Sequence, residues 1–227
     1  MNGRQKVGAV IAAAGSSQRM DGADKVFALL GGEPILARVV GAFQRCNPID
    51  RIVVVLSEQN LERGKQLVIA QGWSKVIDVC VGGRRRQDSV AAGLRWLSNC
   101  NWAVIHDGAR PLVTVDLINR GLEAAEETGV AVAAVPVTDT IKMAGDDRIV
   151  RHTQPRQNLW VVQTPQVFSI KIMAEAYSRT SGDVTDDASL VEQLGYRVKI
   201  YMGAYDNIKI TTPDDLELGN LLPKVEG

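Results

Sequence analysis

Short, continuous apolar runs recur along this chain and alternate with segments in which apolar residues recur at helical spacing. The apolar runs cover residues 7–14, 51–57, 76–81, 102–106 and 130–137. The helical segments cover residues 34–46, 59–71, 87–98 and 115–128. Because continuous rather than alternating apolar strands are typical of sheets buried on both faces, the pattern predicts an α/β fold. We expect a mostly parallel, Rossmann-like twisted sheet with helices on both faces.

The alternation is interrupted at residues 138–158. This segment mixes apolar and polar residues around Ala144-Gly145-Asp146-Asp147, which favours a β-hairpin. A lone hairpin is marginally stable in water, so we expect this arm to pack on something else. Beyond it the sequence predicts helices near 169–179 and 185–194, a strand at 197–202, and a helix that begins at Pro213. The economical interpretation is a single domain, residues 1–227, with a protruding arm.

Charge and composition disfavour several classes of protein. Lys and Arg number 26 and Asp and Glu also number 26, so bulk electrostatic binding of nucleic acid is not expected. No apolar run reaches the roughly 20 residues of a membrane helix, and the polar N-terminus lacks a signal-peptide pattern. Cys46, Cys80 and Cys100 form neither a disulfide framework nor a zinc pattern. We therefore expect a cytoplasmic protein with no nucleic-acid and no membrane partner.

The loop after the first strand has the composition of a ligand-binding loop. Its sequence is Ala12-Ala13-Ala14-Gly15-Ser16-Ser17-Gln18-Arg19-Met20. Ligands in open α/β sheets bind beyond the carboxyl ends of strands, and small residues here leave the backbone accessible. Several N–H groups can face a phosphate, with Arg19 and Lys25 as nearby cations. The loop matches neither G-x-x-x-x-G-K-[ST] nor G-x-G-x-x-G, and a tight turn with two surface cations is an equally good interpretation.

Further motifs resemble one family of nucleotidyltransferases. The A-A-G-x-x-x-R-M opening is similar to enzymes that activate sugars and alcohols as nucleoside diphosphates. More specific segments follow it: 82–90, His106-Asp107-Gly108-Ala109-Arg110-Pro111, Asp139-Thr140-Ile141-Lys142, 163–168, 185–189 and 206–211. In this order, across roughly residues 7–218, they resemble the 2-C-methyl-D-erythritol 4-phosphate cytidylyltransferases of the non-mevalonate isoprenoid route.

This resemblance implies transfer of CMP from CTP to the phosphate of 2-C-methyl-D-erythritol 4-phosphate, with release of pyrophosphate. The attacking phosphate oxygen is mostly ionised at neutral pH, because its second pKa is about 6, so no general base is needed. Positioning and charge stabilisation at the α-phosphorus remain. For these the resemblance suggests Arg19, Lys25 and Lys209 as catalytic cations. It also suggests Mg²⁺, or another divalent cation, bound by CTP phosphates and by Asp107.

The resemblance also implies a set of binding residues. Those for CTP are Ala12, Ala13, Ala14, Gly15, Ser16, Ser17, Arg19, Lys25, Gly83, Arg86, Ser89, Asp107 and Gly108. Those for the alcohol phosphate are Asp107, Arg110, Thr140, Arg156, Thr164 and Lys209. Because Arg156 lies on the arm, the resemblance implies a homodimer in which each arm completes the partner's site and buries its own hairpin.

Three other functions stay open. Ribitol 5-phosphate cytidylyltransferases share the fold, the chemistry and a similar segment at residues 106–111, although their opening loop is usually A-G-G. A molybdopterin nucleotidyltransferase would explain Asp24-Lys25 but not the later motifs. A catalytically dead nucleotide-binding protein is disfavoured because the charged residues named above are all present.

Some residues have plain structural interpretations, and others depart from the family. His106 is expected to be held by a backbone hydrogen bond, and Asp186 and Asp187 to favour a first helical turn. Asp24 stands where the family commonly has Pro, Val26 where it has Gln, and Arg84 where relatives are often acidic. An aspartate at position 24 can pair with Lys25 and weaken its hold on phosphate.

Overall fold

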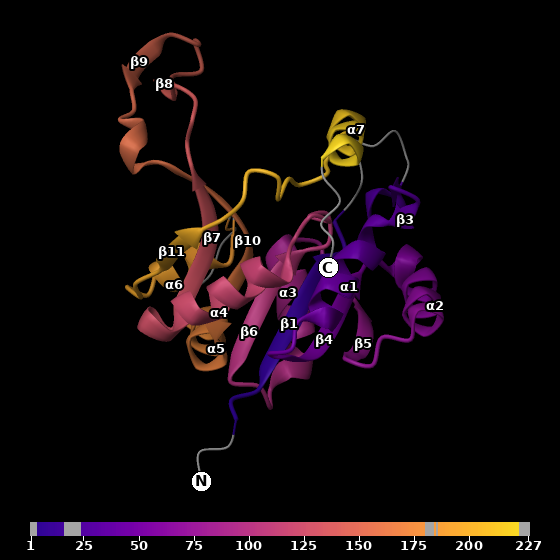
Figure 1. Ribbon diagram of the computed structural model, residues 1–227. Helices are drawn as coiled ribbons and strands as arrows, with labels where there is room; N and C mark the ends of the chain where they lie inside the picture. Colours follow the sequence, from indigo (N-terminus) through magenta and orange to yellow (C-terminus); the bar gives the residue numbers. More distant parts are fainter. Residues whose placement is uncertain (1–3, 16–23, 180–183, 185, 223–227) are drawn as a thin grey trace.

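The chain forms one seven-stranded sheet in this computed structural model, which describes residues 4–15, 24–179, 184 and 186–222. The strand order is β11-β7-β10-β6-β1-β4-β5 (Figure 1). The strands are β1 Val7–Ala13, β4 Ile49–Leu56, β5 Val76–Val81, β6 Trp102–Asp107, β7 Val130–Pro136, β10 Trp160–Ser169 and β11 Lys199–Met202. Neighbours pair in parallel except β10, which runs antiparallel to both β6 and β7. The mostly parallel sheet is confirmed.

Helices cover both faces of this sheet, which is why its strands are apolar throughout. They are α1 Ile35–Arg45, α2 Leu61–Gln71, α3 Arg86–Leu94, α4 Val115–Thr128, α5 Ile170–Arg179, α6 Ala188–Glu192 and α7 Pro213–Leu221. Short helical turns and strands join them: η1 Lys25–Phe27, β2 Leu29–Leu30, β3 Glu33–Pro34, η2 Glu58–Asn60 and η3 Arg95–Leu97. Along β1, Ile11 joins the apolar cluster formed with α1 and α4, whereas Val10 joins a cluster on the opposite face.

Strand β10 was not predicted from the sequence, and its composition explains why. It contains Pro165, and proline lacks the N–H that a central strand donates to its neighbour. The structure accommodates this residue where the pairing of β10 with β7 changes register, between Val162 and Gln166. The same irregular stretch carries Thr164, so the strand that local patterning missed contributes a predicted site residue.

The segment at residues 138–158 forms the predicted hairpin. Strand β8, Lys142–Ala144, pairs antiparallel with β9, Val150–Thr153, and the turn η4, Arg156–Asn158, follows. Every residue of both strands is exposed, and the arm stands away from the sheet (Figure 1). Among the residues described, the arm therefore has almost no core of its own, in agreement with the sequence analysis.

Candidate active site

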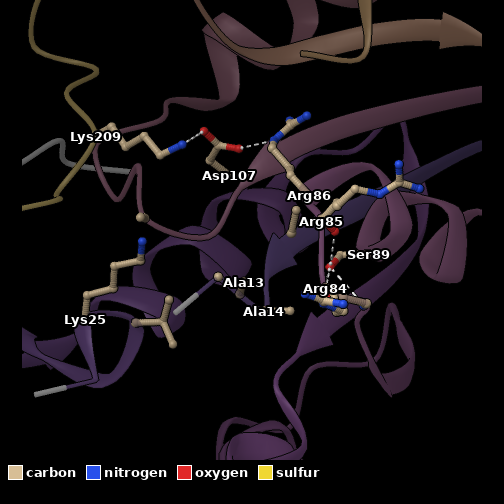
Figure 2. Close-up of a pocket in the computed structure, with 14 residues that line it drawn as sticks. Ala13, Ala14, Lys25, Arg84, Arg85, Arg86, Ser89, Asp107 and Lys209 are labelled. Carbon is tan, nitrogen blue, oxygen red and sulfur yellow. Dashed lines mark hydrogen bonds and ion pairs between the residues drawn. The ribbon is translucent and has the colours of Figure 1, made fainter. Parts of the chain in front are cut away.

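A cavity of about 380 Å³ opens at the carboxyl ends of β1 and β6, beside the start of α3. Most of the residues predicted to bind CTP line it: Ala12, Ala13, Ala14, Gly15, Lys25, Gly83, Arg86, Ser89 and Asp107 (Figure 2). Lys209 lines it as well, although it comes from the segment after β11. Ser16, Ser17 and Arg19 lie outside the described residues. We call this space the first cavity.

Small residues let separate backbone segments meet around the first cavity. Gly108 donates its N–H to Ala12 O at 2.8 Å, and a Cβ at Gly108 would lie 2.6 Å from the Ala13 Cβ. A Cβ at Gly83 would lie 2.3 Å from the Asp88 Cβ. Gly83 also donates its N–H to Ser89 Oγ at 3.2 Å. Glycine is therefore required at both turns, where the neighbouring segments approach closely.

A second cavity, of about 430 Å³, lies on the other side of Asp107. Four of the residues predicted for the alcohol phosphate line it: Asp107, Arg110, Thr164 and Lys209. It shares Asp107, Arg86 and Lys209 with the first cavity. The other two predicted residues, Thr140 and Arg156, are exposed on the arm, where Arg156 Nη1 donates to Thr138 O at 2.6 Å.

Asp107 is surrounded by cations at the boundary between the cavities. Its Oδ1 accepts from Arg86 Nε at 3.1 Å, and its Oδ2 accepts from Lys209 Nζ at 2.8 Å (Figure 2). Arg110 Nε lies 3.7 Å from the same Oδ2. Burial opposes ionisation of this carboxyl, but Arg86 and Lys209 outweigh burial and hold the pKa of Asp107 well below its usual range. Asp107 is therefore an anion at neutral pH.

The segment that carries Lys209 is held in place by a buried amide. Asn207 is fully buried, and its Nδ2 donates to Thr164 O at 2.8 Å. Arg110 Nη1 donates to the Asn207 backbone O at 2.7 Å, and Ile210 N donates to Ala109 O at 2.8 Å. These bonds join the segment to β10 and to the loop after β6. Asn207 was not predicted as a site residue, although it lies in a motif that the sequence analysis singled out.

His106 has the structural role expected for it. Its Nε2 lies 3.1 Å from Arg110 O, and its ring centroid lies 5.3 Å from that of Phe43. Complete burial lowers the pKa of His106 to about 4. His106 is therefore a neutral imidazole that orients the loop after β6 through its backbone partner. It is not among the described residues that line either cavity.

Asp24 caps the turn that carries Lys25. Its Oδ1 accepts from Val26 N at 3.2 Å, and its Oδ2 accepts from the Asn60 side-chain amide. Both carboxylate oxygens therefore have partners other than Lys25. Arg63 lies over the ring of Phe27, 4.1 Å from the ring centroid, and ties the same turn to α2. This chain therefore anchors the turn by side chains of Asp24, Asn60 and Arg63.

The carboxylate that lines the first cavity suits a metal ion that arrives with a nucleotide. Asp107 is the one carboxylate among the described residues that line it. Within the described part of the chain, no group of three or more His, Cys, Asp or Glu residues is arranged to hold a metal. A hard divalent cation with one protein carboxylate takes its other ligands from phosphate oxygens and water. The donor set therefore fits a cation carried by phosphates rather than a resident metal.

Known proteins resemble this chain in both sequence and structure. The family model described as 2-C-methyl-D-erythritol 4-phosphate cytidylyltransferase matches residues 7–222. A protein of that name from Dehalococcoides mccartyi is 53% identical, over 97% of this chain and 97% of its own length. The structure titled 4-diphosphocytidyl-2C-methyl-D-erythritol synthase from Anaerococcus prevotii has a TM-score of 0.84 at 29% identity, covering 96% of this chain and 98% of that one. The Thermus thermophilus cytidylyltransferase has a TM-score of 0.76 at 34% identity, covering 95% and 97%.

Proposed function

The chain belongs to the 2-C-methyl-D-erythritol 4-phosphate cytidylyltransferase family, and from this membership we propose how its residues perform the family's reaction. The enzyme is a CTP-dependent nucleotidyltransferase. It transfers CMP from CTP to the phosphate of 2-C-methyl-D-erythritol 4-phosphate, and it gives the CDP-alcohol and pyrophosphate. Ribitol 5-phosphate is not favoured as the acceptor, because the matched family and the relatives carry the methylerythritol name.

In our proposal each substrate occupies one cavity. CTP lies in the first cavity, where the backbone of residues 12–15, Gly83 and Ser89 receive the nucleotide and Lys25 and Arg19 neutralise its phosphates. The alcohol phosphate lies in the second cavity with Arg110, Thr164 and Lys209. The single observation that carries this arrangement is the shared wall, because both cavities contain Asp107, Arg86 and Lys209. The two phosphates that must react are thereby brought side by side.

The proposed reaction is an in-line displacement at the α-phosphorus of CTP. An ionised oxygen of the alcohol phosphate forms the new P–O bond, and the bond to the bridging oxygen breaks so that pyrophosphate leaves with its electron pair. No side chain has to remove a proton, in agreement with the neutral, buried His106. Lys209, Lys25 and Arg19 stabilise the negative charge that spreads over the transferring phosphoryl group.

We propose Mg²⁺, or another divalent cation, as the cofactor. Asp107 and phosphate oxygens of CTP would hold it, and it would supply positive charge to the triphosphate. Asp107 is the ionised carboxylate that this chain offers to the metal ion. Its Oδ2 is already bonded to Lys209. The cytoplasm remains the predicted compartment. No helix among the described residues is long and apolar enough to cross a membrane.

In our proposal each chain is a single domain, and its arm forms the contact with a second copy in a homodimer. Thr140 and Arg156 are predicted substrate residues, yet both are exposed and neither is among the described residues that line the first or the second cavity. Apolar side chains are exposed on the same arm and on the adjoining half of β10: Ile141, Met143, Ile149, Val150, Val161 and Val162. A second copy of the chain would cover these side chains and receive Thr140 and Arg156 in its second cavity.

Pyrophosphate release tests the acceptor. Purified protein is mixed with CTP and Mg²⁺ and given either 2-C-methyl-D-erythritol 4-phosphate or ribitol 5-phosphate. Release with the methylerythritol phosphate alone is expected. Release with ribitol 5-phosphate alone would keep the mechanism and reassign the substrate, and no release with either would contradict the proposed chemistry.

A further inference from the structure

Arg86 joins two buried carboxylates that belong to distant parts of the fold. Its Nε lies 3.1 Å from Asp107 Oδ1 at the end of β6, and its Nη1 lies 2.5 Å from Asp187 Oδ2 at the start of α6. Asp107 borders both cavities, whereas Asp187 is fully buried and lines neither. One guanidinium therefore links the central carboxylate of the site to an acid outside it.

Asp187 has no helix-capping role that would account for its position. Although it occupies the N-cap of α6, its side chain makes no capping hydrogen bond. The preceding acid, Asp186, performs that task, because its Oδ1 accepts from Ser189 N at 3.1 Å and from Ser189 Oγ at 2.5 Å. Asp187 Oδ1 instead accepts from the hydroxyl of Tyr177 on α5, at 3.2 Å. The expectation of a helical-turn role therefore fits Asp186 and not Asp187.

Asp187 is held by Tyr177 and in turn holds one end of the Arg86 guanidinium. Arg86 is therefore shared between two acids, Asp187 and Asp107. While Nη1 is held by Asp187, the atom that bonds to Asp107 is Nε. An arginine with one carboxylate partner favours a bidentate pair, in which two N–H groups face both oxygens. Without Asp187, Arg86 would therefore turn further onto Asp107 and compete with Lys209 for its oxygens. Buried ion pairs contribute little net stability, so a geometric role explains this one better than a stabilising role.

We propose that Asp187 is a positioning residue for the transfer reaction, which acts through Arg86 to fix the orientation of Asp107, and that Tyr177 holds Asp187 in turn. This inference rests on the central role proposed for Asp107. Asp187 touches no substrate in this arrangement. Its contribution is to keep Asp107 Oδ2 directed at Lys209 and at the boundary where the two phosphates meet.

The test compares Asp187→Asn with Asp116→Asn in steady-state pyrophosphate release. Asp187→Asn is expected to lower kcat by about 10- to 100-fold while the KM for CTP changes by less than about threefold, since misplacement of a catalytic group lowers turnover more than binding. Asp116→Asn is the control, because it changes an acid in the first turn of another helix, α4, that lines neither cavity and pairs with Arg120 rather than Arg86. Thermal unfolding of each variant shows what fraction is folded.

A second measurement separates positioning from general damage. In an Asp107→Asn background, assayed by single turnover at high enzyme concentration, the further change Asp187→Asn should alter the rate by less than about twofold, because the residue that it positions is already gone. An equal loss in both backgrounds would overturn the proposal, as would a loss of the same size in Asp116→Asn. A wild-type enzyme that is inactive with methylerythritol phosphate would instead contradict the proposed function.

Tyr177→Phe carries the test if Asp187→Asn does not fold. It removes the hydroxyl, which bonds to Asp187 and to the backbone O of Gln87, and Phe preserves the packing of the ring. We expect a folded Tyr177→Phe enzyme with a kcat lowered by about two- to fivefold at an unchanged KM for CTP. An unchanged kcat in this variant would contradict the proposal.

Discussion

The centre of the site and the arm both carry predicted substrate residues, but under opposite physical conditions. At the centre, Asp107 is buried and bonded to Arg86 and Lys209 of its own chain. On the arm, Thr140 and Arg156 are exposed, and no residue of strands β8 and β9 is buried. One chain thus completes the charged centre by itself, whereas the arm gains a defined environment only against another surface. Variants at the centre should therefore act within one subunit, and variants on the arm should act between subunits.

The largest effect is expected at the centre, from Lys209→Ala. Removal of one preorganised cation from a phosphoryl-transfer site typically lowers kcat by about 10²- to 10³-fold, and we expect a loss of this size with a smaller change in the KM for CTP. Steady-state pyrophosphate release measures both constants. Lys199→Ala is the control, because Lys199 is half-exposed on β11 and pairs with Glu127 at 2.7 Å. A raised KM with an unchanged kcat would exclude the role assigned to Lys209.

The next largest effect is expected on the arm, from Arg156→Ala. Loss of a charged hydrogen bond to the alcohol phosphate should lower kcat/KM for that substrate by about 10- to 100-fold, and the KM for CTP should stay unchanged. Arg151→Ala offers a matched control, because Arg151 is another exposed arginine of the arm.

Mixed dimers decide whether this effect acts between subunits. When Arg156→Ala chains are mixed with Lys25→Ala chains, half of the dimers should be mixed, and each of these should hold one intact site. Recovery to about a quarter of wild-type activity is therefore expected after subunit exchange. Failure to recover any activity would contradict an arm that enters the partner's site.

The sequence predicted the parts of this site that depend on neighbouring residues. The small residues at 12–15 follow from the end of the first strand, the family resemblance adds Gly83, and the structure brings them to one cavity. The roles of Asn207 and Asp187 could not be predicted in this way. Asn207 bonds to Thr164, 43 residues away, and Asp187 bonds to Arg86, 101 residues away. Strand β10 was not predicted because it contains Pro165, and proline is rare in central strands.

The two histidines test the same contrast between the buried centre and the exposed arm, with a smaller expected effect. The quantity measured is the pH dependence of the free energy of unfolding. The pKa of His106 falls to about 4 through burial, below the value near 6.5 of an unfolded chain. The unfolded state therefore binds more protons, so stability is fully present above about pH 6.5 and is lost as the pH falls toward 4. Between pH 7 and pH 5 this group should account for a loss of about 2 kcal/mol in the free energy of unfolding.

Urea unfolding at the two pH values measures that loss in the wild type and in variants of each histidine. His106→Gln should remove the dependence, provided that it folds. His152→Gln should keep it, because His152 is exposed on β9 of the arm. A pH dependence that survives in a folded His106→Gln variant would assign the titration to another group.

The smallest effect is expected from Ile149→Ser at the tip of the arm. Ile149 is 66% exposed within one chain, so loss of its apolar surface should change the stability of the monomer by less than about 0.5 kcal/mol. If a second copy covers it, the same change should weaken the dimer by about 1 kcal/mol, which corresponds to roughly a fivefold higher dissociation constant. Sedimentation at several concentrations measures the dissociation constant, and unfolding of dilute protein measures the monomer. An unchanged dissociation constant would show that Ile149 stays in solvent, and the proposed interface would then have to be centred on the exposed apolar residues of β10 instead.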